Sequence, residues 1–291
     1  MNILLIGHEG YVGSGLYSFL SKKNKVMGWS HDQDILSITP EVILKNKIKA
    51  VINCATVADK ANQTFKLESQ SDIVNIKGMY NLVKALEGLD VKLVYISTKD
   101  VFGDCISKSD VIEKKDHYAL KHLIDDSQPF APRTVYAKTK LVGEFIAESH
   151  PKSIVIRLSS CYTDFSHHSS NWILNIIKSS LKGEKIKVTS QGKQVRDVLH
   201  VDDLGKLIQL FLDSDCYGKK INAGGGPANT ISILQLIKML DKKTEIEDVG
   251  GIDYGFAFNN RLAKKLFGWS PEELFSEKLP VIINNIKGAS D

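Results

Sequence analysis

The first twenty residues, Met1 to Leu20, read MNILLIGHEGYVGSGLYSFL and decide the expected fold. An apolar run from Ile3 to Ile6 stops at Gly7, and apolar residues at helical spacing follow Gly10 and Gly13. This order predicts a strand, a glycine turn and a helix. Residues without Cβ allow the tight turn, and the free amides at the helix start suit a pyrophosphate. The spacing Gly-x-x-Gly-x-x-Gly therefore indicates a dinucleotide site, although its first gap is one residue longer than in Gly-x-Gly-x-x-Gly.

The composition is that of an ordinary globular protein. Of the 291 residues, 43% are hydrophobic and 25% charged, a length that suits one α/β domain with a smaller partner. No apolar run approaches a membrane span, and the first apolar segment enters a strand directly, unlike a signal peptide. The four cysteines lack metal-ligand spacing and indicate free thiols, so we expect a cytoplasmic protein. The net charge of +4 is not clustered as in a nucleic-acid binder.

Strands and helices alternate along the first half of the chain. We expect strands at 25–29, 48–53 and 91–96, with a helix at 72–87 before the last of them. This rhythm predicts a parallel sheet that is covered on both faces and binds ligands at the carboxyl ends of its strands. The expected class is α/β, with a Rossmann-type doubly wound parallel sheet.

The end of the second strand normally decides between the two nicotinamide cofactors. A carboxylate there binds the ribose 2′-hydroxyl of NAD and repels a 2′-phosphate. Ser30 and His31 occupy this place, which favours NADP(H). NAD(H) stays open, because no arginine is present and Asp32 is close enough to take the ribose role. A solvated loop without a part in cofactor choice is the alternative.

Two further segments carry groups suited to chemistry. The strand that ends at Ile96 leads into Thr98, Lys99 and Asp100. After an irregular surface excursion at 104–128, which we interpret as a lid, a helix begins near Tyr136 and places Lys140 four residues later on the same face. A nearby ammonium lowers the pKa of a phenol toward values useful for proton transfer.

In this order the motifs resemble the extended short-chain dehydrogenase/reductase family, and more narrowly its nucleotide-sugar epimerases, dehydratases and reductases. The resemblance covers nearly the whole chain and rests on Gly7, Gly10 and Gly13, on Asn75 to Asn81, on Thr98 to Gly103, on Tyr136 and Lys140, on Arg196 to Leu204, and on Asn222 to Gly226.

The resemblance implies a set of site residues. The catalytic residues would be Thr98, Tyr136 and Lys140, with Lys99 and Asp100 as auxiliary acid or base groups. The cofactor contacts would be Gly7, Gly10, Tyr11, Val12, Gly13, Ser30, His31, Asp34, Ile35, Cys54, Ala55 and Lys140. The substrate contacts would be Ser160, where relatives commonly have asparagine, together with Asn171, Arg196 and Arg261. The chemistry requires no metal.

The implied substrate is a nucleotide-diphosphate sugar. The 4,6-dehydratases carry Asp-Glu where this chain has Lys99 and Asp100, which argues against dehydration. Val101-Phe102 and 34–36 look like dTDP-4-dehydrorhamnose reductases, whereas 196–203 and 224–226 look like 4-epimerases. We expect reduction of a 4-keto-sugar in the synthesis of cell-surface polysaccharide precursors. A nucleotide-sugar epimerase that retains NAD and a non-catalytic NADP-binding sensor remain alternatives, and a homodimer without nucleic-acid or membrane partners is expected.

The second half continues the pattern. We expect strands at 153–158, 185–188 and 220–223, a helix at 171–182, and a buried helix face around Leu204 and Phe211. Ser232 is expected to cap one helix, and Ser270 with Pro271 to begin another. Arg196 would grip a diphosphate or, alternatively, pair with Asp197 at the surface. The dinucleotide domain would span 1–160 plus about 195–225, and a smaller C-terminal substrate-binding domain about 161–194 plus 226–291.

Overall fold

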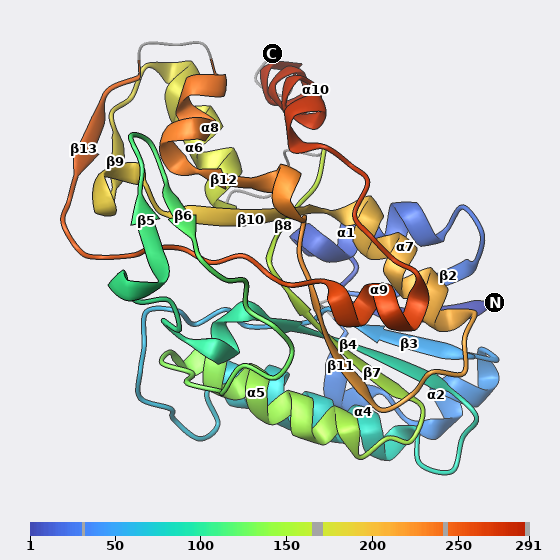
Figure 1. Cartoon of the computed structure of the whole chain (residues 1–291). Coiled ribbons are helices and arrows are strands. Elements are labelled where there is room, and N and C mark those ends of the chain that lie inside the picture. Colours follow the sequence, from blue (N-terminus) through green and yellow to red (C-terminus); the bar gives the residue numbers. More distant parts are fainter. Residues whose placement is uncertain (31–32, 165–170, 241–243, 289–291) are drawn as a thin grey trace.

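The computed structural model describes residues 1–30, 33–164, 171–240 and 244–288. Its centre is a six-stranded sheet in which every strand runs parallel to its neighbours (Figure 1). In spatial order the strands are β2 (Lys25–Trp29), β1 (Asn2–Ile6), β3 (Ala50–Asn53), β4 (Lys92–Thr98), β7 (Ser153–Leu158) and β11 (Lys219–Ala223). The predicted Rossmann-type fold is confirmed. The chain adds strands on both sides of β1, and such a switch point is where open α/β sheets bind ligands.

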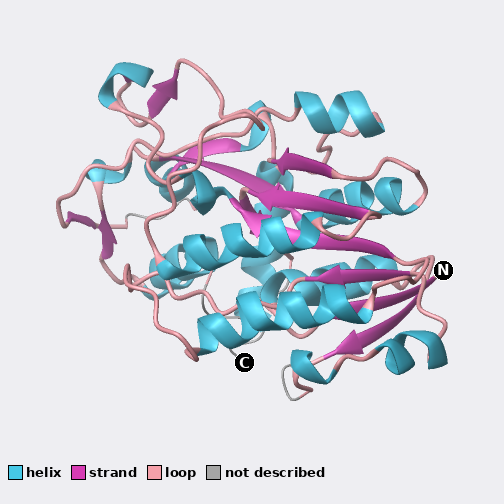
Figure 2. Ribbon diagram, turned by 90° about the horizontal axis from the view of Figure 1, so that it is seen from below, coloured by secondary structure: helices cyan, strands magenta, loops and turns pink. Residues whose placement is uncertain are grey.

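Helices cover both faces of this sheet, as in a doubly wound fold. One face packs against α1 (Tyr11–Leu20), α7 (Val201–Leu212) and α9 (Arg261–Phe267). The other packs against α2 (Pro40–Lys45), α4 (Gly78–Ala85) and α5 (Val135–Glu148), which lie below the sheet in Figure 1. Seen from below, helices run alongside the strands (Figure 2). Because both faces are buried, the central strands are mostly apolar, as in Ile3–Ile6.

A smaller set of elements lies beyond the carboxyl ends of the strands (Figure 1). A three-stranded sheet contains β8 (Ser160–Tyr162), β10 (Val195–His200) and β12 (Thr230–Ser232), and β9 (Ile186–Val188) pairs with β13 (Ile246–Asp248). These strands pack with α6 (Trp172–Lys182), α8 (Ile233–Met239) and α10 (Phe275–Gly288). None of the helices within the described segments is both long and apolar enough to cross a membrane.

The excursion at 104–128 contains a short antiparallel hairpin, β5 (Val111–Glu113) and β6 (Tyr118–Leu120). The hairpin reaches the smaller part of the molecule, because the carbonyl of Asp116 accepts a hydrogen bond from the Ser232 hydroxyl at 2.6 Å. Ser232 also caps α8 in a capping box with Gln235, as predicted. The turn of the hairpin is therefore fastened to the start of α8.

Two expected helices differ from the structure. The helix predicted at 72–87 begins earlier, as α3 (Gln70–Asp72), and continues into α4 through a π-helical turn at Ile73–Lys77. The start predicted at Ser270 is wrong, because α10 begins only at Phe275. The amides of Glu272 and Glu273 instead donate to the buried Asp203 carboxylate at 2.9 and 2.8 Å, which holds this stretch extended.

Candidate active site

The glycine turn lies at the carboxyl end of β1. Gly7 has a φ of +77°, and a Cβ there would lie 2.9 Å from the backbone nitrogen of Ala55 at the end of β3. A Cβ on Gly13 would lie 2.0 Å from the Gly7 carbonyl oxygen. Gly10 caps α1, which begins at Tyr11 and Val12. The turn therefore requires glycine for steric reasons and leaves the backbone amides of a helix start open to a phosphate.

The end of β2 lies beside this turn. The Ser30 amide donates to Gln33, and the Asp34 carboxylate accepts from the Leu36 amide at 2.8 Å. His31 lies outside the described residues. Ile35 is a packing residue, since a Cβ on Gly78 of α4 would lie 2.5 Å from its side chain. The carboxylate of Asp34 thus serves the local turn.

One side chain near the end of β2 was missed by sequence reasoning. The ring of His8 lies over Gly28, whose missing Cβ would fall 2.5 Å from the ring. Its Nδ1 is buried and has no hydrogen-bond partner in the described structure. His8 therefore brings an unused polar atom to the strand end that sequence reasoning linked to cofactor choice.

Thr98 and Tyr136 are brought together by β4 and α5. Thr98 ends β4, and Tyr136 lies in the first turn of α5, where the Thr134 hydroxyl accepts from the Ala137 amide. Burial raises the pKa of Tyr136 to about 12, and a hydrogen bond with Thr98 opposes that rise. The expectation that Lys140 lowers the pKa of this phenol is wrong for the free chain, because burial dominates and the Asp100 carboxylate raises the pKa further.

Lys140 is buried one turn further along α5. Its ammonium lies 4.1 Å above the centre of the Tyr95 ring. Burial lowers the pKa of Lys140 to about 7, while Cys54 and Glu144 raise it. Cys54 directly follows β3 and precedes Ala55, and burial raises the pKa of its thiol to about 12. Lys140 and Cys54 therefore lie near each other, and Cys54 lies beside the glycine turn.

The auxiliary pair after Thr98 forms a chain of charges. The Asp100 carboxylate lies 2.9 Å from Lys99 and 3.4 Å from Lys60. Although burial acts to raise it, the pKa of Asp100 is lowered by these two ammonium groups. The ammonium of Lys60 also lies 5.2 Å from the centre of the Tyr136 ring. Lys60 belongs to an irregular loop, and nothing in the sequence pattern marked it.

The same loop covers the start of α5. The amides of Val135 and Tyr136 donate to the carbonyls of Asn62 and Asp59 at 2.8 and 2.9 Å. Asn75, in the π-helical turn, accepts from the Val57 amide and donates to Val57 and to the Thr139 hydroxyl. Asn75 belongs to a motif that sequence reasoning quoted without a role. It ties the loop to the helix that carries Tyr136.

Arg196 lines a second region, at a cavity of about 420 Å³ between α6, β9 and α8. Its guanidinium pairs with Asp253, with the shorter contact at 2.5 Å. The alternative of a surface pair with Asp197 is wrong, because Asp197 is buried and accepts from the amides of Gly225 and Phe258. Lys99 lines a further cavity, of about 210 Å³, together with Asp253 and Tyr254. The two cavities share Asp253 as a neighbouring charge.

The remaining predicted residues are placed less directly. The Asn171 side chain caps α6 and donates to the Cys161 carbonyl, so its polar atoms serve the fold. The Tyr11 hydroxyl accepts from the Thr163 amide, and burial raises its pKa. Ser160 lies in β8 opposite Val198. Arg261 begins the exposed end of α9 and is not among the residues that line the cavity beside Arg196.

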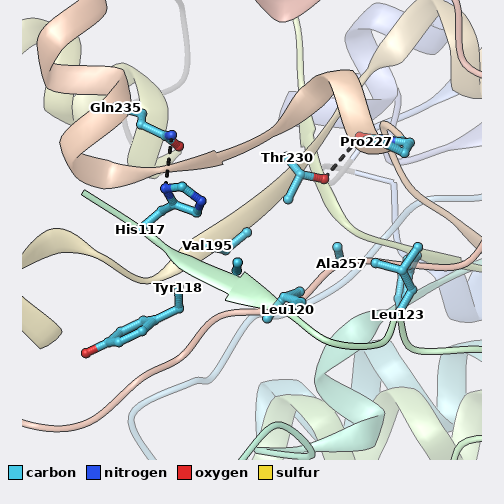
Figure 3. Close-up of a pocket in the computed structure, with 12 residues that line it drawn as sticks. His117, Tyr118, Leu120, Leu123, Val195, Pro227, Thr230, Gln235 and Ala257 are labelled. Carbon is cyan, nitrogen blue, oxygen red and sulfur yellow. Dashed lines mark hydrogen bonds between the residues drawn. The ribbon is translucent and has the colours of Figure 1, made fainter. Parts of the chain in front are cut away.

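A cavity of about 270 Å³ lies between the β5–β6 hairpin, β12 and α8 (Figure 3). His117 points toward Gln235 at its upper edge, at a donor–acceptor distance of 3.5 Å. Val195 and Ala257 form part of its wall. Thr98, Tyr136 and Lys140 do not line this cavity, so it is separate from the catalytic candidates.

Comparison with known proteins places this site in a family. The profile of the NAD dependent epimerase/dehydratase family matches residues 3–224. The match covers more than half of the chain, and the chain belongs to this family. The resemblance to the extended short-chain dehydrogenase/reductases is thereby confirmed.

Individual relatives are distant in sequence. A dTDP-glucose 4,6-dehydratase of Mycolicibacterium smegmatis is 24% identical over 208 residues, which cover 68% of this chain and 60% of that protein. CDP-paratose 2-epimerase of Salmonella typhi is 23% identical over 85% of this chain and 86% of its own length. The match with the dehydratase thus spans about three fifths of its length.

Solved structures share the fold over the full chain. A dTDP-glucose 4,6-dehydratase from Bacillus anthracis, in complex with NAD, has a TM-score of 0.80 at 23% identity. The match covers 99% of this chain and 97% of the dehydratase chain. UDP-glucuronic acid 4-epimerase from Bacillus cereus, in complex with UDP-glucuronic acid and NAD, has a TM-score of 0.82 at 21% identity. The match covers 99% of this chain and 100% of the epimerase chain. These relatives are dehydratases and epimerases, so the expectation of a keto-sugar reductase rests on the site.

Proposed function

We propose that this protein reduces a nucleotide-linked 4-keto-sugar with a nicotinamide dinucleotide as hydride donor. The observation that carries the proposal is the Tyr136 phenol, which is half-buried at the start of α5 and hydrogen-bonded with Thr98, and whose pKa is raised to about 12, so that it stays protonated. A reduction requires a proton donor beside the carbonyl oxygen. An oxidation begins from a proton acceptor, and burial disfavours the phenolate that would serve as one.

The chain's own residues fit a dinucleotide. The cradle at Gly7 and Gly13 has no room for a Cβ and leaves the amides at the start of α1 available for a pyrophosphate. The cofactor supplies the hydride when it is bound. Tyr136 donates a proton to the sugar oxygen, Thr98 hydrogen-bonds the same oxygen, and Lys140 holds the nicotinamide ribose.

Dehydration is disfavoured by the charges around Asp100. Loss of water from a sugar requires a base that removes a proton from carbon, and Asp100 is the carboxylate that follows Thr98 most closely. Its two ammonium partners, Lys60 and Lys99, lower its pKa and weaken it as a base. This supports chemistry limited to hydride and proton transfer at one carbon.

An epimerase that retains NAD is the second candidate. The named epimerases support it, since the chain matches the CDP-paratose 2-epimerase over most of both lengths. Retention requires a firm hold on the adenosine ribose through two opposite hydride transfers. The Asp34 carboxylate is used by the Leu36 amide, and Ser30 offers no carboxylate, which favours release of the cofactor in each cycle. A sensor without turnover is the third alternative.

For the substrate, we propose that the nucleotide lies in the cavity beside Arg196 and the sugar near Lys99. A guanidinium matches the oxygens of a diphosphate in charge and geometry. Asp253 lines the cavity beside Lys99 and pairs with Arg196, which lines the other cavity, and this is consistent with a substrate that runs from one to the other. The elements around β8, β10 and β12, with α6, α8 and α10, would then form the substrate-binding part.

For the cofactor, we propose a preference for NADP(H) over NAD(H). Ser30 replaces a carboxylate that would repel the 2′-phosphate. The His8 ring lies beside the same strand end, and its buried Nδ1 has no partner in the described structure. Calorimetric titration with both dinucleotides tests this, and tighter binding of NAD(H) would contradict it.

Two further expectations stay proposals. Tyr80 of α4 and Val142 and Phe145 of α5 expose large apolar side chains, which supports a homodimer through these helices. Sedimentation of Phe145→Asp beside the wild type would test it. A cytoplasmic place in the synthesis of polysaccharide precursors rests on the proposed substrate and on the four free cysteines.

A panel of nucleotide-sugars in a thermal shift assay tests the proposed substrate class. Ligands that bind only the folded chain raise its melting temperature. We expect dTDP- or UDP-linked sugars to raise it in the wild type and to have little effect on Arg196→Met. Arg133→Met is the matched control, because Arg133 is an exposed arginine outside the cavities. An equal response in Arg196→Met would contradict the assignment.

A further inference from the structure

A buried ion pair joins α5 to the two central strands beneath it. The Glu144 carboxylate receives Nε and Nη2 of Arg157 at 3.0 and 2.8 Å, and the Ser97 hydroxyl donates to it at 2.5 Å. Ser97 and Arg157 are cross-strand partners in the parallel pair of β4 and β7. Glu144 and Arg157 each expose about 1% of their side chains. A buried carboxylate needs hydrogen-bond donors for its oxygens, and Ser97 and Arg157 donate to the Glu144 carboxylate.

The rest of the guanidinium is also engaged. Nη1 of Arg157 donates to the Asp126 carbonyl at 3.2 Å, and the guanidinium lies 5.1 and 4.9 Å from the centres of the Phe102 and Phe130 rings. Arg157 therefore cannot turn away from Glu144 without losing several contacts. The carboxylate is fixed in place beneath α5.

Glu144 lies one helical turn after Lys140, which itself lies one turn after Tyr136. The Lys140 ammonium lies over the Tyr95 ring of β4, and the two groups whose charge acts on it are Cys54, just after β3, and Glu144, which follows Lys140 by four residues on α5. Tyr95 also donates its hydroxyl to the Lys140 carbonyl at 3.3 Å. Burial raises the pKa values of the Cys54 thiol and the Tyr95 phenol, so both are neutral at physiological pH. Glu144 is thus the one carboxylate among these named neighbours.

We infer that Glu144 is a positioning residue, fixed by Ser97 and Arg157, whose carboxylate keeps the Lys140 side chain an ammonium at the dinucleotide site. The inference rests on the proposed function, in which Lys140 holds the nicotinamide ribose. An ammonium offers three donors to ribose hydroxyls, whereas a neutral amine offers fewer and carries no charge. Without Glu144, burial would leave Lys140 neutral over more of the physiological range.

The test is the affinity for NAD⁺ and NADP⁺ as a function of pH. Each dinucleotide is titrated calorimetrically into the intact chain between about pH 6 and about pH 9, in the wild type and in Glu144→Gln. We expect affinity to weaken as pH rises through the pKa of Lys140, and to weaken at lower pH in the variant. A change of about one pH unit in this midpoint corresponds to about tenfold weaker binding above it.

Two further variants make the result decisive. Glu144→Gln leaves a buried guanidinium without its carboxylate, so Glu144→Gln with Arg157→Met supplies a chain without that unpaired charge. The matched control is Asp203→Asn, which removes another fully buried carboxylate, on α7, held by the Glu272 and Glu273 amides. We expect the control to lower the melting temperature and to keep the wild-type pH dependence.

The outcomes separate the inference from the proposed function. If the wild type binds neither dinucleotide, the proposed function fails and the inference fails with it. If the wild type binds and both Glu144 variants follow the wild-type pH curve, only the inference fails. A midpoint that moves to lower pH in the Glu144 variants and not in Asp203→Asn supports it.

Discussion

Lys140 is buried and Tyr136 is half-buried, and the loss of hydration favours the neutral form of each. The pKa of the phenol is raised to about 12 and the pKa of the ammonium is lowered to about 7. The phenol is therefore a proton donor throughout the neutral range, while Lys140 is close to its titration point. This division of roles suits a site that delivers a proton to a carbonyl oxygen.

Replacing Tyr136 by phenylalanine removes the hydroxyl alone. Because the proton then has no donor beside the sugar oxygen, we expect kcat to fall by roughly a hundredfold or more. Dinucleotide affinity should stay within about twofold, since the ring keeps its packing. Steady-state kinetics and calorimetry check both values. A variant that retained most of its kcat would direct attention to Lys99 as the donor.

Lys140→Met should stabilise the free chain while it weakens dinucleotide binding. Between the folded pKa of about 7 and the ordinary value of 10.5, the unfolded chain binds more protons, so this lysine makes stability rise with pH. The loss of folding stability caused by the buried Lys140 ammonium is fully present below the folded pKa of about 7. We expect a gain of roughly 1 to 3 kcal/mol near neutral pH, shrinking toward pH 10.

Urea unfolding at two pH values checks the gain in Lys140→Met. Lys138→Met is the matched control, because Lys138 lies on the exposed side of the same helix and donates only to the Gln63 carbonyl. A loss of stability in Lys140→Met near neutral pH would contradict this prediction, because it would show that contacts with the Lys140 ammonium stabilise the fold by more than its burial costs.

At the scale of elements, the sequence predicted what short-range physics controls. The turn at Gly7 to Gly13 was predictable because sterics permit only glycine there, and the apolar strands because both of their faces are buried. The π-helical turn at Ile73–Lys77 was not, and the hydrogen bonds of its Asn75 to Val57 and Thr139 join segments that lie far apart in the sequence. The same holds for Lys60 and Asp253, whose partners lie far away in the sequence.

Asn75→Ala should release the loop at 56–63 from α5. The Asn75 amide makes hydrogen bonds to Val57 and Thr139 and is itself buried, so we expect a loss of about 1 to 3 kcal/mol in the free energy of unfolding. Hydrogen exchange should quicken in the loop and in the first turn of α5. Asn284→Ala, at an exposed site of α10, should change stability by less than about 0.5 kcal/mol. Unchanged exchange in the Asn75 variant would contradict this role.

At the scale of the molecule, the parallel sheet brings every catalytic candidate to one end. Thr98 ends β4, Cys54 follows β3 and the glycine turn follows β1, so segments far apart in the sequence meet beside α5 (Figure 1). The sequence allowed this meeting to be predicted, since parallel strands share one carboxyl edge. It did not allow the ion pair of Arg196 with Asp253 to be predicted, because that contact depends on the path of an irregular segment.

The measurement that most directly tests the central claim is the fate of the cofactor during turnover. A dTDP-4-keto-6-deoxy-sugar is supplied with NADPH, and the absorbance of the reduced nicotinamide is followed beside Tyr136→Phe. In parallel, a nucleotide-hexose is incubated without added cofactor and examined for a new stereoisomer. We predict stoichiometric loss of NADPH that depends on Tyr136. Formation of a stereoisomer with cofactor that co-purifies, and without net consumption of NADPH, would contradict the reductase and favour the epimerase.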